Sequence, residues 1–181
     1  AMGLAAINIG TTGVEGDFSA PLQHTTPDAL TLHKALADAV GAGITHAAME
    51  ASSHGLDQKR LEGVRLMAAG FTNLSQDHLD YHPDFADYFA SKELLFSERV
   101  PEGGRAVINV DSEWGRRMAD TARERGLDTV TIGWRGDDLA IREITPRPAS
   151  QDVIFSWQGT EHHLDIPLVG EFQVLNALCA A

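Results

Sequence analysis

Short apolar runs alternate with helix-like segments as far as residue 134, and this alternation limits the fold more than any other feature of the chain. Buried strands are expected where an apolar run stops at turn residues, at 4–9, 45–51, 66–74, 105–110 and 128–134. Helices are expected where apolar side chains recur every three or four residues, at 28–41, 84–100 and 113–125. Alternating strands and helices favour a mostly parallel sheet with helices on both faces, so the expected fold class is α/β.

The pattern changes after Gly136. Strand-like segments then follow one another with short polar links and no helix between them, at 139–144, 152–157 and 163–168. They predict a small antiparallel sheet within residues 136–168, added to the α/β core. Residues 176–181 resemble the first turns of a helix, so we interpret residues 1–181 as a single domain that is truncated at both ends.

Composition excludes several kinds of function. The net charge is −12, and an acidic chain repels phosphate backbones, so no nucleic-acid partner is expected. The single cysteine, Cys179, fits a reducing compartment and excludes a disulfide framework and a four-cysteine zinc site. No apolar run reaches the roughly 18 residues of a membrane span, so no membrane insertion is expected.

Polar side chains gather where the expected strands end, in residues 49–54, 71–82 and 109–111. This matters because ligands of open α/β sheets bind beyond the carboxyl ends of the strands. Glu50 either binds a divalent cation or caps the turn that follows it. Ser52 and Ser53 either bind ligand oxygens or cap a helix, and no Gly-x-Ser-x-Gly turn surrounds them to support a nucleophilic serine.

The second cluster is dense in titratable groups, namely Asp77, His78, Asp80 and His82. His78 and His82 would share one face of a helix, but Leu79 stands where a His-Glu-x-x-His zinc motif needs glutamate. One interpretation is a magnesium site that uses one histidine and carboxylates. The other is a polar turn with a pair of surface histidines.

Lys92 lies on the apolar stripe of its own expected helix. It follows Phe89 by three residues, Tyr88 by four and Phe85 by seven, and these spacings share one helix face. Its amine either reaches the edge of that face in its charged form or is buried in its neutral form. A neutral amine reacts with carbon dioxide, and the resulting carbamate is an anionic oxygen ligand that suits Mg²⁺.

The signal for phosphate binding is weak. The segment Gly10–Gly13 is a short glycine and threonine turn that could hold a phosphate, but the sequence Gly-x-x-x-x-Gly-Lys-Ser/Thr does not occur. Any ATP P-loop would therefore have to lie upstream of residue 1.

Taken together, these clusters resemble the central domain of the Mur ligases, a fold similar to that of P-loop nucleotide hydrolases, and most closely the MurE type. The matching stretches run in family order and nearly from end to end: Thr25–Pro27, Met49–His54 with Gln58 and Arg60, Phe71–His82, Tyr88–Lys92, Asn109–Asp111 and Gly170–Asn176. The Ser-Ser-His block and the Asp-His-Leu-Asp-Tyr-His block are long and specific. One departure is Gln173, which stands where the family usually has asparagine.

The resemblance implies an ATP-dependent amide ligase of peptidoglycan synthesis in the cytoplasm, with ATP and Mg²⁺ as cofactors. In that reaction ATP phosphorylates the free carboxylate of UDP-MurNAc-L-Ala-D-Glu. The amine of the third amino acid, diaminopimelate or lysine, then attacks the acyl phosphate. The resemblance also implies that the P-loop and the two outer domains lie outside these 181 residues, which are therefore expected to be inactive alone. It leaves the oligomeric state open.

The resemblance also assigns roles to individual residues. Glu50 matches a residue that binds Mg²⁺ beside the ATP phosphates, and His78 matches one that binds a second Mg²⁺. Lys92 matches a carbamylated lysine that supports this second metal, so these three are the expected catalytic and metal-binding residues. Contacts with the UDP-linked substrate are expected from Thr25, Thr26, Ser52, Gln58 and Arg60. Asn176 matches an asparagine near the adenine of ATP.

Two other functions remain alternatives. One is another ligase of the same fold, either a different Mur ligase or a folylpolyglutamate synthase. The Ser-Ser-His-Gly-Leu block with Gln58 and Arg60 favours the MurE type over these. The other is a non-catalytic module that binds a sugar nucleotide, and such a module would bind its ligand without a metal.

Overall fold

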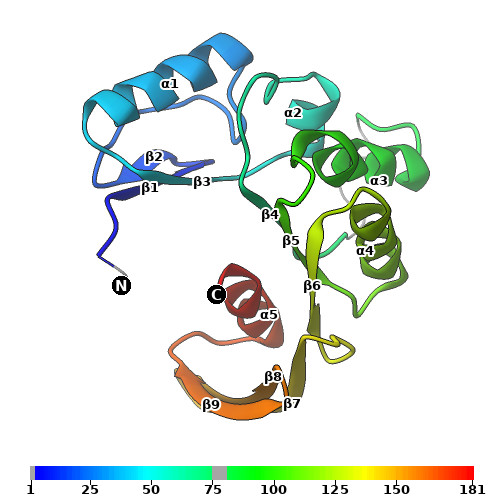
Figure 1. The fold of residues 1–181 in the computed structure, drawn as a ribbon. Coiled ribbons are helices and arrows are strands. Elements are labelled where there is room, and N and C mark those ends of the chain that lie inside the picture. The colour runs from blue at the N-terminus through cyan, green and yellow to red at the C-terminus, as the bar shows by residue number, and fades with distance from the viewer. Residues whose placement is uncertain (1–2, 75–80) are drawn as a thin grey trace. The chain divides into compact units, whose positions relative to one another are not determined.

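The computed structural model describes residues 3–74 and 81–181 (Figure 1). These residues form two compact units. The first contains residues up to 64 together with 81–95, and the second contains residues 65–74 together with 96–181. The chain therefore leaves the first unit, contributes a short segment to the second, returns, and then completes the second.

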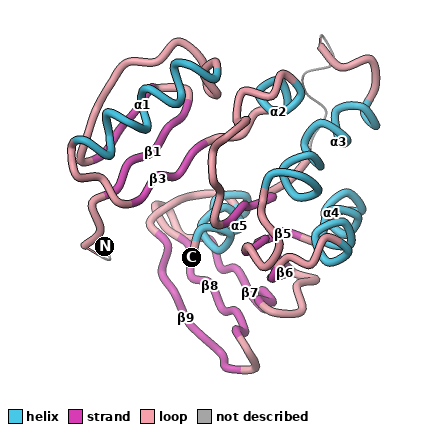
Figure 2. Tube along the Cα trace, turned by 45° about the horizontal axis from the view of Figure 1, so that its top comes forward, coloured by secondary structure: helices cyan, strands magenta, loops and turns pink. Residues whose placement is uncertain are grey.

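A small three-stranded sheet lies in the first unit. Its strands are β1 (Ala6–Gly10), β2 (Gly13–Gly16) and β3 (His46–Met49), in the order β2-β1-β3. Strands β1 and β2 form an antiparallel hairpin, whereas β1 and β3 are parallel. Helix α1 (Ala29–Gly41) runs along one face of this sheet (Figures 1 and 2).

Helix α1 begins at a side-chain cap. The Asp28 carboxylate accepts hydrogen bonds from the Thr31 hydroxyl (2.6 Å) and the Thr31 backbone N–H (3.1 Å). These bonds favour the ionised carboxylate and hold the pKa of Asp28 below its usual value. Helical spacing in the sequence predicts a buried face of Leu32, Leu36, Ala39 and Val40. Leu32 and Ala39 are buried, together with Ala35, whereas Val40 is 71% exposed, so the prediction for Val40 is wrong.

Two further helices complete the first unit. They are α2 (Ser53–Asp57) and α3 (Phe85–Leu94), and they contact each other. The Asp84 carboxylate caps α3 by accepting from the Asp87 N–H (2.9 Å). The helix expected over 84–100 is confirmed as far as Leu94, and its last turn, Leu95–Arg99, is a π-helix (η1), a wider turn that apolar spacing does not distinguish from an α-helical one.

The second unit contains a mixed six-stranded sheet in sequential order. Its strands are β4 (Ala68–Phe71), β5 (Arg105–Asn109), β6 (Asp128–Gly133), β7 (Leu139–Pro146), β8 (Gln151–Trp157) and β9 (Thr160–Ile166). The pairs from β4 to β7 are parallel, and those from β7 to β9 are antiparallel. Helices α4 (Glu113–Glu124) and α5 (Glu171–Ala180) cover opposite faces of β5 and β6 (Figures 1 and 2).

The α/β class with helices on both faces is confirmed, but the strands are divided differently from the expectation. The antiparallel strands expected within 136–168 exist, yet they continue the parallel sheet through the pairing of β6 with β7. The separate small sheet lies instead at β1–β3. Strand β2 was not expected, because a four-residue segment with a glycine at each end does not look like a strand.

One hydrophobic core cluster of the second unit lies between its sheet and α5. Seven buried side chains form it, namely Ile132, Leu139, Ile141, Val153, Ile166, Val174 and Leu178. Cys179 lies beside this core, where burial raises the pKa of its thiol. Within the described residues, no helix is both long and apolar enough to cross a membrane.

Candidate functional site

Two of the residues expected to bind metal or substrate, Glu50 and Ser52, are hydrogen-bonded through their backbone to the Thr26 side chain. This side chain is 1% exposed, and its hydroxyl donates to the Glu50 carbonyl oxygen (2.8 Å) and accepts from the Ser52 N–H (2.9 Å). Gly55 packs against the Thr26 methyl group, and a Cβ at position 55 would lie 2.6 Å from it. Thr26 therefore fixes the backbone on both sides of Ala51, where the chain passes from β3 into α2.

Glu50 follows β3, and its carboxylate lies over the end of β1. A Cβ added to Gly10 would come within 2.9 Å of Glu50 Oε1, so Gly10 leaves the space that the carboxylate occupies. Glu50 is exposed, and none of the described residues forms an ion pair with it. An exposed carboxylate at the ends of two paired strands is a suitable oxygen ligand for a divalent cation.

The segment Gly10–Gly13 closes the β1–β2 hairpin. Gly10 and Gly13 are paired across the turn, and Gly13 has φ 110°, a conformation that favours glycine. The Thr11 hydroxyl lies 2.9 Å from the Thr25 hydroxyl, which brings the expected substrate residue Thr25 to this turn. The glycines thus have a structural role, and phosphate binding by the turn stays a prediction.

Ser52 acts as the cap of α2, because its hydroxyl accepts from the Gly55 N–H (3.1 Å). Ser53 is buried, and its hydroxyl has no hydrogen-bond partner within the part of the chain that the structure describes. The capping interpretation therefore holds for Ser52.

Gln58 and Arg60 form one hydrogen-bonded group just after α2. The side-chain oxygen of Gln58 (Oε1) accepts from Arg60 Nε (3.0 Å) and Nη2 (2.6 Å). Arg60 Nη1 donates to the backbone carbonyl oxygen of Thr26 (2.7 Å). The Gln58 amide donates to the Tyr81 hydroxyl (3.2 Å), which in turn donates to the Asp57 carboxylate (2.6 Å). The expected substrate residues Thr26, Gln58 and Arg60 are therefore brought together, and sequence reasoning missed Tyr81 and Asp57.

Lys92 lies in the last turn of α3 and is half-buried. Its Nζ lies 5.3 Å from the centroid of the Tyr88 ring, and both Tyr88 and Phe89 are buried. The apolar stripe expected from spacing is thus present, with the lysine beside an aromatic ring. His78, the residue expected to share its metal, lies outside the described residues.

His82 is not a surface histidine, so that part of the alternative interpretation is wrong. The side chain is 1% exposed, and its Nδ1 lies 2.7 Å from an Asp87 carboxylate oxygen. Its ring packs against those of His54, Tyr81 and Tyr88, at centroid distances of 5.7, 4.9 and 5.3 Å. Because α3 begins three residues later, the start of that helix carries His82 into the interior.

The third polar cluster and Asn176 lie in the second unit. The Asp111 carboxylate accepts from the backbone N–H groups of Trp134 (3.1 Å) and Arg135 (2.9 Å), so it holds the turn after β6. Asn176 is exposed on α5, which starts at Glu171, five residues earlier than expected. Within 3–74 and 81–181, no three histidine, cysteine, aspartate or glutamate side chains are grouped closely enough to hold a metal.

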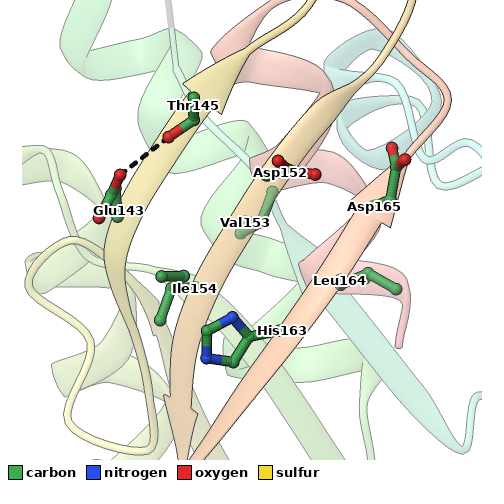
Figure 3. Close-up of a pocket in the computed structure, with 8 residues that line it drawn as sticks. All are labelled: Glu143, Thr145, Asp152, Val153, Ile154, His163, Leu164 and Asp165. Carbon is green, nitrogen blue, oxygen red and sulfur yellow. Dashed lines mark hydrogen bonds between the residues drawn. The ribbon is translucent and has the colours of Figure 1, made fainter.

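A shallow groove crosses strands β7, β8 and β9 of the second unit (Figure 3). Glu143, Asp152 and Asp165 give it an acidic character, but Asp152 forms an ion pair with Arg147, and the Glu143 carboxylate accepts from Thr145 (2.8 Å). None of the residues expected to bind substrate, nucleotide or metal lines this groove.

Comparison with known proteins identifies similar sequences and structures. A UDP-N-acetylmuramoyl-L-alanyl-D-glutamate–2,6-diaminopimelate ligase of Agrobacterium fabrum is 49% identical over 99% of this chain, and one of Chelativorans sp. is 47% identical over the same share. A solved structure of a protein with the same name has a TM-score of 0.86 at 33% identity and covers 98% of this chain and 36% of its own. FPGS from Lactobacillus casei, with 16% identity and a TM-score of 0.68, covers 98% of this chain and 50% of its own, and shares the fold alone.

This chain spans only 37% of the length of either curated relative. The Mur ligase middle domain family matches residues 2–181, nearly the whole chain. The chain therefore belongs to the Mur ligase middle domain family.

Proposed function

We propose that this chain is the middle domain of a ligase that joins diaminopimelate to UDP-MurNAc-L-Ala-D-Glu with ATP. The names of relatives at 49% and 47% identity support the reaction and favour diaminopimelate over lysine. The observation that carries the proposal is the group formed by Thr26, Gln58 and Arg60. It holds a guanidinium next to the strand end that presents the Glu50 carboxylate.

The chain's own residues would act by positioning and by charge. Arg60 would bind an anionic group of the UDP-linked substrate, since a guanidinium pairs with oxyanions through two parallel N–H bonds. Thr26 and Ser52 would hold the β3–α2 connection in the shape that this substrate requires. Fixing the reacting carboxylate in this way lets ATP phosphorylate it and lets the incoming amine displace phosphate.

Glu50 would hold one Mg²⁺ ion, and His78 with a carbamylated Lys92 would hold a second. Carboxylate and carbamate oxygens are hard ligands of the kind that this cation prefers, and the space left by Gly10 is consistent with a Glu50 carboxylate that points away from the sheet. The metal would neutralise negative charge on the phosphate oxygens. Asn176 is proposed to contact the adenine.

The reaction itself tests the proposal. The full-length protein is incubated with UDP-MurNAc-L-Ala-D-Glu, ATP and Mg²⁺, with either diaminopimelate or lysine, and the tripeptide product and ADP are measured. We expect product with diaminopimelate and none after the metal is chelated. Metal-independent binding of the sugar nucleotide without product would instead support the non-catalytic module, and glutamylation of a folate would support the other ligase.

Replacing Arg60 with alanine in the full-length protein is expected to raise KM for the UDP-linked substrate more than KM for ATP. Loss of one charged contact costs about 1.5–3 kcal/mol, or roughly 10- to 150-fold. Steady-state kinetics with each substrate varied in turn gives the two constants. The exposed Arg65 provides a matched control, because Arg65→Ala removes the same charge away from this group. A defect confined to ATP would contradict the role of Arg60.

Replacing Gly10 with alanine is expected to displace the Glu50 carboxylate, because the new methyl group would lie 2.9 Å from Oε1. Moving a catalytic group out of position lowers the rate by about tenfold or more. We expect a lower kcat and a higher requirement for Mg²⁺, measured by metal titration of the full-length protein. Gly41→Ala adds the same methyl group where nothing lies within 4 Å, and it should leave both values unchanged. If Gly10→Ala and Gly41→Ala have the same kcat and the same requirement for Mg²⁺, the proposal that Glu50 binds the metal is contradicted.

A further inference from the structure

We propose that Tyr81 is a positioning residue for the UDP-linked substrate, and that its hydroxyl acts through Gln58 on Arg60. This inference rests on the proposed function, because it deepens the role of Arg60 there. Neither the motif that contains Tyr81 nor the spacing along the chain suggests it. Gln58 lies just after α2, and Tyr81 directly precedes His82. The two side chains come into contact only in the folded chain.

The direction of the hydrogen bonds follows from which groups can donate. A tyrosine hydroxyl has a single proton, and an ionised carboxylate only accepts. The proton therefore goes to Asp57 (2.6 Å), which leaves the Tyr81 oxygen to accept from the Gln58 amide nitrogen (3.2 Å). With its nitrogen held in this way, the Gln58 amide cannot flip, and its oxygen must face Arg60.

The Gln58 oxygen in turn orients the guanidinium. It accepts from both Nε and Nη2 of Arg60, while Nη1 donates to the carbonyl oxygen of Thr26. Among the described residues these bonds use three of the five guanidinium N–H groups. Within the described part of the chain the other two are left for an oxyanion, and the plane in which they lie is set by Gln58 and Thr26.

The ring of Tyr81 has a separate structural role, which makes the hydroxyl testable alone. The ring lies 3.9 Å from that of His54 and 4.9 Å from that of His82, measured between centroids. Tyr81→Phe keeps these ring contacts and removes only the hydroxyl. The hydrogen bond of this hydroxyl to Asp57 lies at the exposed surface. The variant is therefore expected to fold with the melting temperature of the parent protein.

The test is a double-mutant cycle in the full-length protein, with the UDP-MurNAc-dipeptide and ATP varied in turn. Tyr81→Phe is expected to raise KM for the UDP-linked substrate by about three- to tenfold, the usual effect of losing one hydrogen bond, with KM for ATP unchanged. In a Gln58→Ala background the same replacement should change KM less than twofold, because the hydroxyl then has no amide to hold.

Asp57 supplies a second pair of variants that avoids any change to the ring. Asp57→Asn keeps an acceptor for the tyrosine proton and should retain KM, whereas Asp57→Ala should raise KM in the same substrate-selective way as Tyr81→Phe. The proposal is overturned if both Tyr81→Phe and Asp57→Ala leave KM for the UDP-linked substrate unchanged. It is also overturned if Tyr81→Phe raises this KM by the same factor in the parent protein and in the Gln58→Ala background. If the parent protein forms no product from the UDP-linked substrate, the proposed function fails instead, and the two failures are thereby distinguished.

Discussion

Alanine at position 92 is expected to lower kcat/KM of the full-length protein by about 100-fold or more while leaving the protein folded. Lys92 is half-buried on α3 beside Tyr88, and there a neutral amine could bond to carbon dioxide and lose a proton to give a carbamate. Loss of a charged group that holds the metal cluster has an effect of this size on the chemical step. The measurement is the rate of product formation at saturating Mg²⁺, with circular dichroism to confirm the fold.

Short carboxylates such as formate or acetate should restore part of the activity of Lys92→Ala, because a small anion can occupy the space of the carbamate. Lys92→Arg should not be active, since a guanidinium keeps its positive charge and cannot take up carbon dioxide. Lys34→Ala, on the exposed face of α1, is the matched control and should have normal activity. A Lys92→Ala protein with near-normal kcat would end the carbamate hypothesis.

Replacing Gly115 with alanine is expected to destabilise the second unit by about 3 kcal/mol or more. Gly115 lies in the first turn of α4, and a Cβ there would overlap the carbonyl oxygen of Asn109 at the end of β5. Neither backbone can move without separating the helix from the strand, so the overlap is costlier than a clash with a flexible side chain. Urea unfolding followed by tryptophan fluorescence measures this, because all three tryptophans of the chain lie in the second unit.

Asp120→Ala in the same helix is the control for that experiment. It removes only an exposed ion pair with Arg123 (3.4 Å), which is worth less than about 1 kcal/mol. Equal unfolding midpoints for Gly115→Ala and Asp120→Ala would mean that α4 does not approach β5 as closely as the structure has it.

Much of the fold could be predicted because local signals were strong. Asp28 before the periodic residues of α1, and Pro101-Glu-Gly-Gly104 after the helix that contains Lys92, mark element ends by physical rules that act within a few residues. The assignment of strands to sheets could not be predicted in this way. Strands β1 and β3 look like the strands that follow them, and only long-range pairing decides that they form a sheet of their own.

The candidate site shows the same division. Glu50 could be selected because a carboxylate at a strand end suits a cation, and the family resemblance supplied Gln58 and Arg60. Tyr81 could not be selected, since its value depends on hydrogen bonds to residues more than twenty positions earlier in the chain. The burial of His82 could not be predicted, because polarity alone does not reveal that Asp87 lies against its ring nitrogen.

The interleaving of the two units along the chain has a consequence for synthesis on the ribosome. Strand β4 emerges before α3, but its described partner strand is β5, which begins more than thirty residues later. During that interval β4 presents unpaired backbone groups, and in the first part of it the first unit still lacks the helix that carries Lys92. Neither unit can therefore be completed before the other has begun, and a stalled chain that ends between β4 and β5 is the form most exposed to aggregation and to proteases.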